Sequence, residues 1–237
     1  FNKFNTAICR ERVKKVVEMA SQRLEMHKCR DLHVFILGDL IHGCTHVSAR
    51  VQSDELVCDQ LMQVTELLAQ ALFELSQRVS HLYVHMTYGN HARTVQNKND
   101  SVHADNMERI VPWWLKMRFI NAGNVDVVDE DYGEVLYANV HGYDFGGTHG
   151  DLDNVKSSPR LIPALFNKTY DLNVDYILLG DKHHHESFDE LGVRAMIVGS
   201  LCGTDDYANE HRLYSDPEQT LLIVNNVGVD AEYHIKL

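Results

Sequence analysis

The stretch LHVFILGDLIH, residues 32–42, joins an apolar run of strand-forming residues to a Gly-Asp pair. The same arrangement recurs in LYVHMTYGNH (82–91), YDFGGTHGD (143–151) and VDYILLGDKH (174–183). Each run is typical of a buried strand, so Asp, Asn or His side chains follow the carboxyl ends of four predicted strands. Because open α/β sheets bind their ligands at that edge, the sequence predicts a metal site there.

The segments around these strands favour an α/β fold. Helical spacing or composition predicts helices at residues 6–26, 54–79, 105–118 and 155–167. Short strand-forming runs are predicted at residues 125–130, 134–140, 193–199, 220–227 and 231–237. Strand–helix–strand order followed by strand-rich sequence predicts two packed sheets flanked by helices. A single domain spanning residues 1–237 is expected.

The order of the four motifs resembles the calcineurin-like metallophosphoesterases, a superfamily that hydrolyses phosphoesters with two metal ions. The pattern of that superfamily runs Asp-x-His, Gly-Asp, Gly-Asn-His, His and Gly-His-x-His. The last four elements lie in this order across residues 38–183, whereas the first is absent and Asp181 stands where the family has His. The resemblance implies a four-layer αββα sandwich of two mixed β-sheets flanked by helices, with the N-terminal strand missing from this chain.

The resemblance also implies the ligands of two divalent metal ions. Asp39 would bridge the two ions, although a lone Gly-Asp is also a common turn. Asn90 would hold the second ion through a neutral amide oxygen, together with His149. Asp181 would serve the second ion and His183 the first, because residues two apart lie on one side of an extended segment.

Two of these assignments have rivals in the sequence. His141 is also followed by Gly and is the alternative to His149. In the run Asp-Lys-His-His-His, a shifted register would use His183 and His185 as the ligand pair. The metal is expected to be Mn²⁺, with Mg²⁺, Fe or Zn²⁺ as alternatives, because carboxylate, amide and imidazole groups suit these ions.

Two histidines are expected to act on the substrate. By the resemblance, His91 would approach the phosphate and donate a proton near the leaving oxygen, which imidazole can do near neutral pH. The string Gly-Asp-Leu-Ile-His resembles the DNA-repair exonuclease and phage-encoded branch of the superfamily. By that analogy His42 would contact the substrate phosphate, and the alternative is a hydrogen bond from His42 to Asp39.

The resulting hypothesis is a metal-dependent phosphoester hydrolase in which a metal-bound hydroxide attacks phosphorus. A phosphodiester of DNA is the first candidate substrate, and small phosphate esters are the alternative. The net charge of −12 favours the alternative, since a DNA enzyme usually carries a basic track. A catalytically impaired scaffold with the same fold is a further hypothesis, motivated by the missing first motif and by Asp181.

Composition bears on the environment and on two aromatic residues. The chain of 237 residues contains no apolar run of about 18 or more, so no membrane partner is expected. Five cysteines without a Cys-x-x-Cys pair favour reduced thiols and a cytoplasmic location. Trp113 and Trp114 have apolar neighbours at helical spacing and are expected to pack in the core, with stacking on bases as the alternative.

Overall fold

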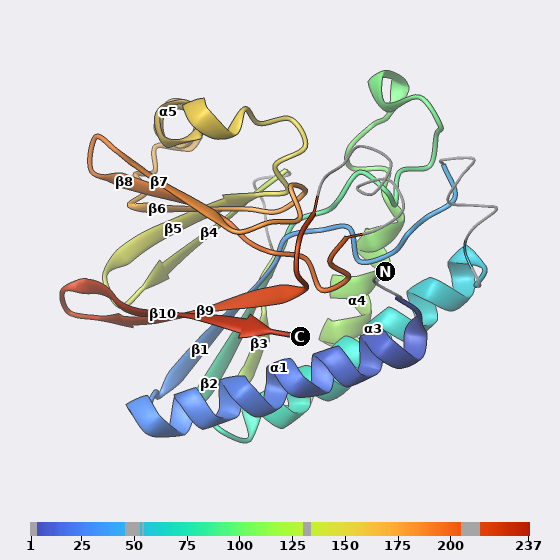
Figure 1. Ribbon diagram of the computed structural model, residues 1–237, viewed down its shortest axis with the longest axis horizontal. Coiled ribbons are helices and arrows are strands. Elements are labelled where there is room, and N and C mark those ends of the chain that lie inside the picture. The colour runs from blue at the N-terminus through green and yellow to red at the C-terminus, as the bar shows by residue number, and fades with distance from the viewer. Residues whose placement is uncertain (1–3, 46–52, 54, 130–133, 205–213) are drawn as a thin grey trace. The chain divides into compact units, whose positions relative to one another are not determined.

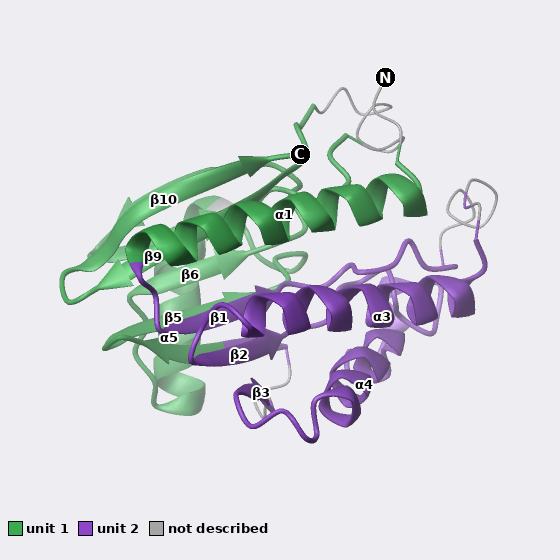
Figure 2. Cartoon of the chain, turned by 90° about the horizontal axis from the view of Figure 1, so that it is seen from below, with its two compact units in different colours: residues 1–27, 137–237 green, residues 28–136 purple. Residues whose placement is uncertain are grey.

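The computed structural model describes residues 4–45, 53, 55–129, 134–204 and 214–237. Contacts between Cα atoms divide the chain into two compact units, which Figure 2 shows in different colours. One unit comprises residues 1–27 and 137–237, and the other comprises residues 28–136. Both units contain helices and a β-sheet, so the expected α/β class is confirmed.

The unit of residues 28–136 is built on a parallel sheet with the strand order β1-β2-β3. Its strands are β1 (Asp31–Ile36), β2 (His81–Met86) and β3 (Val125–Val127), labelled in Figure 1. Parallel neighbours need crossover connections, and helices supply them here. The helical segments are α3 (Val57–Ser76), the short 3-10 turns η1 (Lys98–Asp100) and η2 (Met107–Arg109), and α4 (Ile110–Arg118).

The core of this unit forms where α3 and α4 pack beside the sheet. Leu82 of β2 and Leu115 of α4 are completely buried. Helix α4 turns inward only the stripe that contains Val111 and Leu115, which lie four residues apart. Trp113 is 59% exposed and Trp114 is 36% exposed, so the prediction that both pack in the core is wrong.

A stack of aromatic rings covers one face of β1 and β2. The ring of His33 lies 4.5 Å from that of Tyr83 and 5.4 Å from that of His85, because alternate residues of neighbouring strands share a face. Nδ1 of His33 is 3.2 Å from Nε2 of His85. Burial, followed by the neighbouring His85, lowers the pKa of His33 from 6.5 to about 4 against the opposing effect of Asp31.

This depressed pKa predicts that acid destabilises the folded chain through His33. Between about pH 6.5 and about pH 4 the unfolded state binds a proton that the folded state does not, so the stability present above pH 6.5 is lost as pH falls. We expect His33 to account for a loss of roughly 1–2 kcal/mol, a reduced figure because the ring is partly exposed. Urea unfolding at neutral and at acidic pH should show a smaller pH dependence in His33→Phe, and equal pH dependence in both proteins would contradict the prediction.

The second unit contains a five-stranded mixed sheet with the order β4-β5-β6-β8-β7. Its strands are β4 (Val135–Val140), β5 (Tyr143–Thr148), β6 (Tyr176–Leu179), β7 (Glu186–Glu190) and β8 (Val193–Ile197). Strands β5, β6 and β8 are parallel, whereas β7 is antiparallel to β8. Helix α5 (Ser158–Tyr170) follows the 3-10 turn η3 (Val155–Ser157) and packs beside β6, β7 and β8.

Gly146 of β5 allows helix α5 to pack closely against the sheet. A Cβ atom on Gly146 would lie 2.9 Å from Cζ of Phe166, which is completely buried on α5. A side chain at this position would therefore collide with the aromatic ring that holds the helix on the sheet. Ile177 of β6 and Ala195 of β8 are also completely buried. The core of this unit thus centres on the parallel strands that carry two of the predicted motifs.

The remaining elements of this unit are a long helix and a hairpin. Helix α1 (Thr6–His27) precedes the sheet in sequence, and β9 (Glu218–Asn225) pairs antiparallel with β10 (Gly228–Lys236). Nε2 of His27 is 2.7 Å from the hydroxyl of Tyr233, and the guanidinium of Arg23 lies 4.8 Å from the centre of the same ring. These contacts join α1 to β10. None of the described helices combines the length and the apolar character that crossing a bilayer requires.

Candidate metal centre

Asp39 lies in a tight turn directly after β1. The backbone dihedral φ is +85° at Gly38 and +53° at Asp39, which places both residues in the left-handed region. For a residue with a Cβ atom this conformation costs about 1 kcal/mol or more. Such conformations persist where surrounding contacts enforce them, and they cluster at functional sites.

The turn after β1 touches the turn after β2 because both contain glycine. A Cβ atom on Gly38 would lie 2.3 Å from the backbone nitrogen of Gly89, and one on Gly89 would lie 2.0 Å from Oδ1 of Asp39. Neither distance is sterically possible, so the close approach requires glycine at both positions. The Asp39 carboxylate consequently lies against the backbone that leads into Asn90.

The imidazole of His91 is oriented from both sides by this arrangement. The backbone N–H of His91 donates a hydrogen bond to Oδ1 of Asp39 over 2.9 Å, and its Nε2 is 3.7 Å from Oδ2 of the same carboxylate. Nδ1 of His91 is 3.2 Å from the carbonyl oxygen of His42, which accepts if Nδ1 carries the hydrogen. The ring of His42 stacks on that of His91 with 6.1 Å between centroids. His42 therefore supports His91 through its backbone and its ring.

Asn90 presents a side-chain amide at the end of the same turn. Its backbone carbonyl accepts a hydrogen bond of 2.6 Å from the guanidinium of Arg93, which is almost completely buried. Among the described residues, no hydrogen bond to the side-chain amide of Asn90 is present. The amide oxygen is thus held in place by its backbone while remaining available as a ligand.

Glu108 positions the turns after β1 and β2, and the sequence analysis did not single it out. Its side chain is completely buried, and its two carboxylate oxygens accept hydrogen bonds from the backbone N–H of Leu40 over 2.6 Å and of Gly89 over 2.8 Å. One carboxylate therefore holds both glycine turns in register. Asn106 reinforces the arrangement by donating from Nδ2 to the carbonyl of Gly89 over 2.8 Å.

A signal for Glu108 was present in the sequence. The residue lies three positions before Val111 and seven before Leu115, so it shares the apolar face of the helix that begins there. A carboxylate on such a face must find buried hydrogen-bond donors, because burying an unpaired charge is costly. The two backbone amides of the motif turns provide them.

The motifs of the other unit meet at the carboxyl ends of β5 and β6. Thr148 of β5 is opposite Leu179 of β6, so the residues that follow them, His149 and Gly180, are level. His149 is 3% exposed, and its Nε2 is 3.7 Å from Oδ1 of Asp181. Gly150 has a φ of +96°, and a Cβ atom on it would lie 3.1 Å from the carbonyl oxygen of Gly180. The sheet register thus brings His149 and Asp181 together.

The segment after β6 is a turn and not an extended strand. The dihedral φ is +60° at Asp181 and +62° at His183, and the backbone N–H of Lys182 donates to the carbonyl of Gly180 over 2.7 Å. The expectation that Asp181 and His183 share one side of an extended segment is therefore wrong. Within the described residues, no hydrogen bond or ion pair involves the His183 side chain. Lys182 forms an ion pair of 2.7 Å with Oδ2 of Asp181.

The two rival histidines lie elsewhere in the same unit. His141 occupies the turn between β4 and β5, at the opposite end of β5 from His149, and its Nε2 is 2.5 Å from Oδ1 of Asn226. His185 lies just before β7, and its Nε2 is 3.2 Å from Oε1 of Glu232. Burial lowers the pKa of His185 below its ordinary value, and the neighbouring His234 adds to this effect.

The donor groups of each unit suit a divalent cation. Asp39 and Asn90 offer a carboxylate and a neutral amide oxygen, the ligand types that Mn²⁺ and Mg²⁺ prefer. Nε2 of His149 and Oδ1 of Asp181 are 3.7 Å apart, which is too long for a hydrogen bond. Two atoms that each bond one ion at about 2.1 Å lie roughly 3–3.5 Å apart, so a small closure would let them share an ion.

Comparison with known proteins gives a distant curated relative. No known family model matches the chain. The chain is 22% identical over 217 residues to the SPbeta prophage-derived uncharacterized protein YonJ of Bacillus subtilis strain 168. The match covers 88% of this chain and 52% of YonJ, so the chain spans about half the length of this curated relative.

The solved structures that are similar to the chain include two that match most of its length at low sequence identity. A single mutant of Vps29 from Entamoeba histolytica is 14% identical with a TM-score of 0.41, and the match covers 92% of this chain and 88% of Vps29. An archaeal phosphodiesterase is 13% identical with a TM-score of 0.40, covering 86% of this chain and 99% of its own. At scores this low, neither structure assigns a role to any residue of this chain.

Proposed function

We propose that the chain is a divalent-metal-dependent phosphoester hydrolase. The observation that carries the proposal is the Asp39 carboxylate, which is held against Gly89 in a strained turn and oriented toward His91. A carboxylate that only capped a turn would need neither the left-handed backbone nor the contact with a second glycine turn. The left-handed backbone and the contact with the second glycine turn are expected where the carboxylate must be preorganised to bind a ligand.

The proposed ligands are the residues that follow the parallel strands. Asp39 would hold both divalent ions, with Mn²⁺ as the first choice. Asn90, His149 and Asp181 would hold the second ion, and His183 would hold the first. Bound cations at these positions supply Lewis acidity, which polarises a phosphoryl oxygen and acidifies a water molecule. Asp181 in place of a neutral ligand makes the second position more anionic and favours a hard cation.

The proposed role of His91 is to deliver a proton to the leaving oxygen. Its Nδ1 faces the carbonyl of His42, which favours hydrogen on Nδ1 and leaves Nε2 as the atom that gains and loses the catalytic proton. Oδ2 of Asp39 lies 3.7 Å from this Nε2. Proton donation to a developing alkoxide by a positioned imidazole contributes about 10²–10⁴-fold to a rate.

The proposed substrate is a phosphodiester, with DNA as the first candidate. The position of His42 beside His91 supports a second contact to the substrate phosphate. Trp113 and Trp114 are exposed and so are available for stacking on bases, and the prophage origin of the curated relative favours a phage-encoded enzyme. The net charge of −12 supports the second candidate, a small phosphate ester, because no electrostatic attraction to DNA is expected from it.

A hydrolysis assay with matched histidine variants tests this function. With Mn²⁺ and bis-p-nitrophenyl phosphate, we expect His91→Ala to lower kcat by about 10²–10⁴-fold. His81→Ala is the control, because His81 begins the same strand, β2, at its opposite end and pairs with Asp126. The control should hydrolyse the substrate at the rate of the unmodified chain.

The outcomes of the assay separate the activity from the substrate. Equal turnover by His91→Ala and the unmodified chain would refute the role of His91, and absence of any Mn-dependent turnover would favour the scaffold hypothesis. Single-stranded DNA is assayed in parallel. Hydrolysis of bis-p-nitrophenyl phosphate without cleavage of DNA would remove the nuclease proposal alone and leave the small phosphate ester as substrate.

A further inference from the structure

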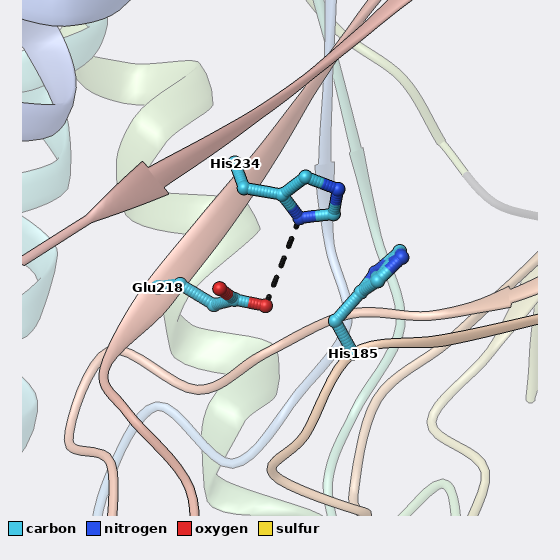
Figure 3. Close-up of side chains that lie close together, drawn as sticks. All are labelled: His185, Glu218 and His234. Atoms are coloured by element: carbon cyan, nitrogen blue, oxygen red, sulfur yellow. Dashed lines mark ion pairs between the residues drawn. The ribbon is translucent and has the colours of Figure 1, made fainter.

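A second group of potential metal ligands lies in the unit of residues 1–27 and 137–237. It consists of Glu218 at the start of β9, His234 on β10 and His185 just before β7. One ligand atom of each residue lies within 4.8 Å of the others. In Figure 3 the imidazole of His234 and the carboxylate of Glu218 face each other, and the side chain of His185 rises beside them from a neighbouring segment.

The pairing of β9 with β10 places these groups on one face of the hairpin. Lys236 is opposite Glu218 and His234 is opposite Thr220, so residues two apart on each strand share that face. Glu232 follows on the same face of β10. The ring of His185 contacts this face, with 4.2 Å between its centroid and that of His234. The face is therefore unusually polar for one that buries Glu218.

The distance between His234 and Glu218 is too long for a direct hydrogen bond. Nδ1 of His234 is 3.8 Å from Oε1 of Glu218, whose side chain is only 5% exposed. A hydrogen bond would draw these atoms to about 2.7–3.2 Å. Ligands of a tetrahedral ion with bonds of about 2.1 Å lie roughly 3.4 Å apart, so a closure of a few tenths of an ångström at this pair would admit an ion.

Buried polar atoms beside the group lack hydrogen-bond partners. Within the described residues, Nδ1 of His185 and Oγ1 of Thr220 are buried without a hydrogen bond. Buried polar groups are nearly always paired, and an unpaired one in a native structure indicates a missing ion, water molecule or functional constraint. Nδ1 of His185, which lacks a hydrogen-bond partner, belongs to the same group as Glu218 and His234, whose facing atoms are too far apart for a hydrogen bond.

A network of ion pairs alone is the simpler explanation for this group of side chains, but the charges in the group do not balance. Lys236 forms an ion pair with Oε2 of Glu218, which leaves Oε1 facing His234. Glu232 adds a second carboxylate, with Oε1 at 3.2 Å from His185 and 3.6 Å from Nε2 of His234. Two carboxylates thus surround one lysine and two histidines, and with neutral histidines the group keeps a net negative charge. A cation would balance that charge.

We propose that His185, Glu218 and His234 form a binding site for a divalent transition-metal ion, distinct from the proposed hydrolytic centre. Two imidazoles and one carboxylate are the ligand set of many zinc sites that keep a fourth position for another ligand. Glu232 lies where it orients both histidines. A bound ion would join the segment before β7 to the β9–β10 hairpin, which are far apart in sequence, and would stabilise this unit.

Zinc binding to the full chain tests the site. We expect His185→Ala and His234→Ala each to weaken the binding of one Zn²⁺ per chain by at least about 100-fold in calorimetric titration. His184→Ala is the matched control, because His184 is adjacent in sequence, exposed, and bonded to the carbonyl of Lys182 over 2.8 Å. The control should bind as many zinc ions as the unmodified chain, with the same affinity.

A second variant changes the affinity in the opposite direction. Lys236→Gln removes a positive charge beside Glu218, and we expect it to tighten binding of this zinc ion roughly tenfold. A purely structural ion-pair network would not produce this gain. Circular dichroism and thermal melts without metal verify that each variant is folded.

Hydrolysis assays keep this site separate from the proposed function. His185→Ala and His234→Ala should retain Mn-dependent hydrolysis of bis-p-nitrophenyl phosphate while losing the zinc ion. Unchanged zinc binding in both variants would refute the site. Joint loss of zinc and of hydrolysis would also refute it, because His185 would then belong to the hydrolytic centre through the shifted register.

Discussion

Exchange of Asp39 for Asn is expected to lower Mn-dependent hydrolysis of bis-p-nitrophenyl phosphate by a factor on the order of 10³. Asn keeps an acceptor oxygen for the backbone N–H of His91, so the turn that Gly38 and Gly89 enclose should survive. The lost negative charge is the one proposed to hold two cations beside His91. Turnover should fall while the free energy of unfolding changes by less than about 1 kcal/mol.

A control for Asp39→Asn is available in the same unit. Asp126 on β3 is a carboxylate that pairs with His81 over 2.9 Å and is largely exposed. Asp126→Asn removes the same charge from the chain and should leave kcat within about twofold of the unmodified value. Full activity of Asp39→Asn, or equal losses in both variants, would show that Asp39 does not hold the metal ions.

Exchange of Glu108 for Gln is expected to destabilise the chain and to impair hydrolysis together. The carboxylate accepts from the backbone N–H of both Leu40 and Gly89, and an amide of the same shape can accept only one of these bonds. Its NH₂ group would face a buried donor, at a cost of about 2–4 kcal/mol. The melting temperature should fall by roughly 5–15 °C.

The loss of activity in Glu108→Gln has a separate cause. One of the two turns that carry Asp39 and Asn90 would lose its anchor, and a displacement of about 1 Å can reduce a rate 100-fold. Glu66→Gln is the control, since Glu66 on α3 makes exposed contacts, an ion pair with Arg118 and a hydrogen bond accepted from Gln70. Urea unfolding and kcat should both be near normal in the control. Unaltered stability of Glu108→Gln would contradict the bridging role of its carboxylate.

The strands that carry the motifs could be predicted from the sequence. The run at residues 32–37 corresponds to β1 and the run at 82–87 to β2, each displaced by one residue. Buried parallel strands are apolar throughout, and the glycine that follows each of them marks its end. This combination requires only local information. The location of the motif residues at the carboxyl ends of these strands therefore followed without any knowledge of side-chain contacts.

The contacts that orient the site could not be predicted in the same way. Glu108 binds backbone amides 68 and 19 residues earlier in the chain, and hydrogen bonds to the backbone leave no pattern in the partner's sequence. The carbonyl of His42 supports His91 irrespective of its own side chain. Long-range backbone contacts of this kind become visible only when the chain has folded.

Two local predictions failed for physical reasons that the structure makes clear. Strand β7 was not predicted, because Glu186–Glu190 is an edge strand whose charged residues suit exposure and hide its pattern. Asp181 and His183 were expected on an extended segment, yet both adopt positive φ. The sequence did not indicate this conformation, because residues other than glycine and asparagine seldom adopt it. Pairing with β8 determines the conformation of β7.

The most direct test is the position of manganese in crystals of the chain grown with Mn²⁺, located by anomalous diffraction at the manganese absorption edge. The account predicts two peaks about 3.5–4 Å apart, both bonded to the Asp39 carboxylate, with Asn90 and Asp181 on one of them. Manganese bound elsewhere in the crystal, with no peak at Asp39, would contradict it.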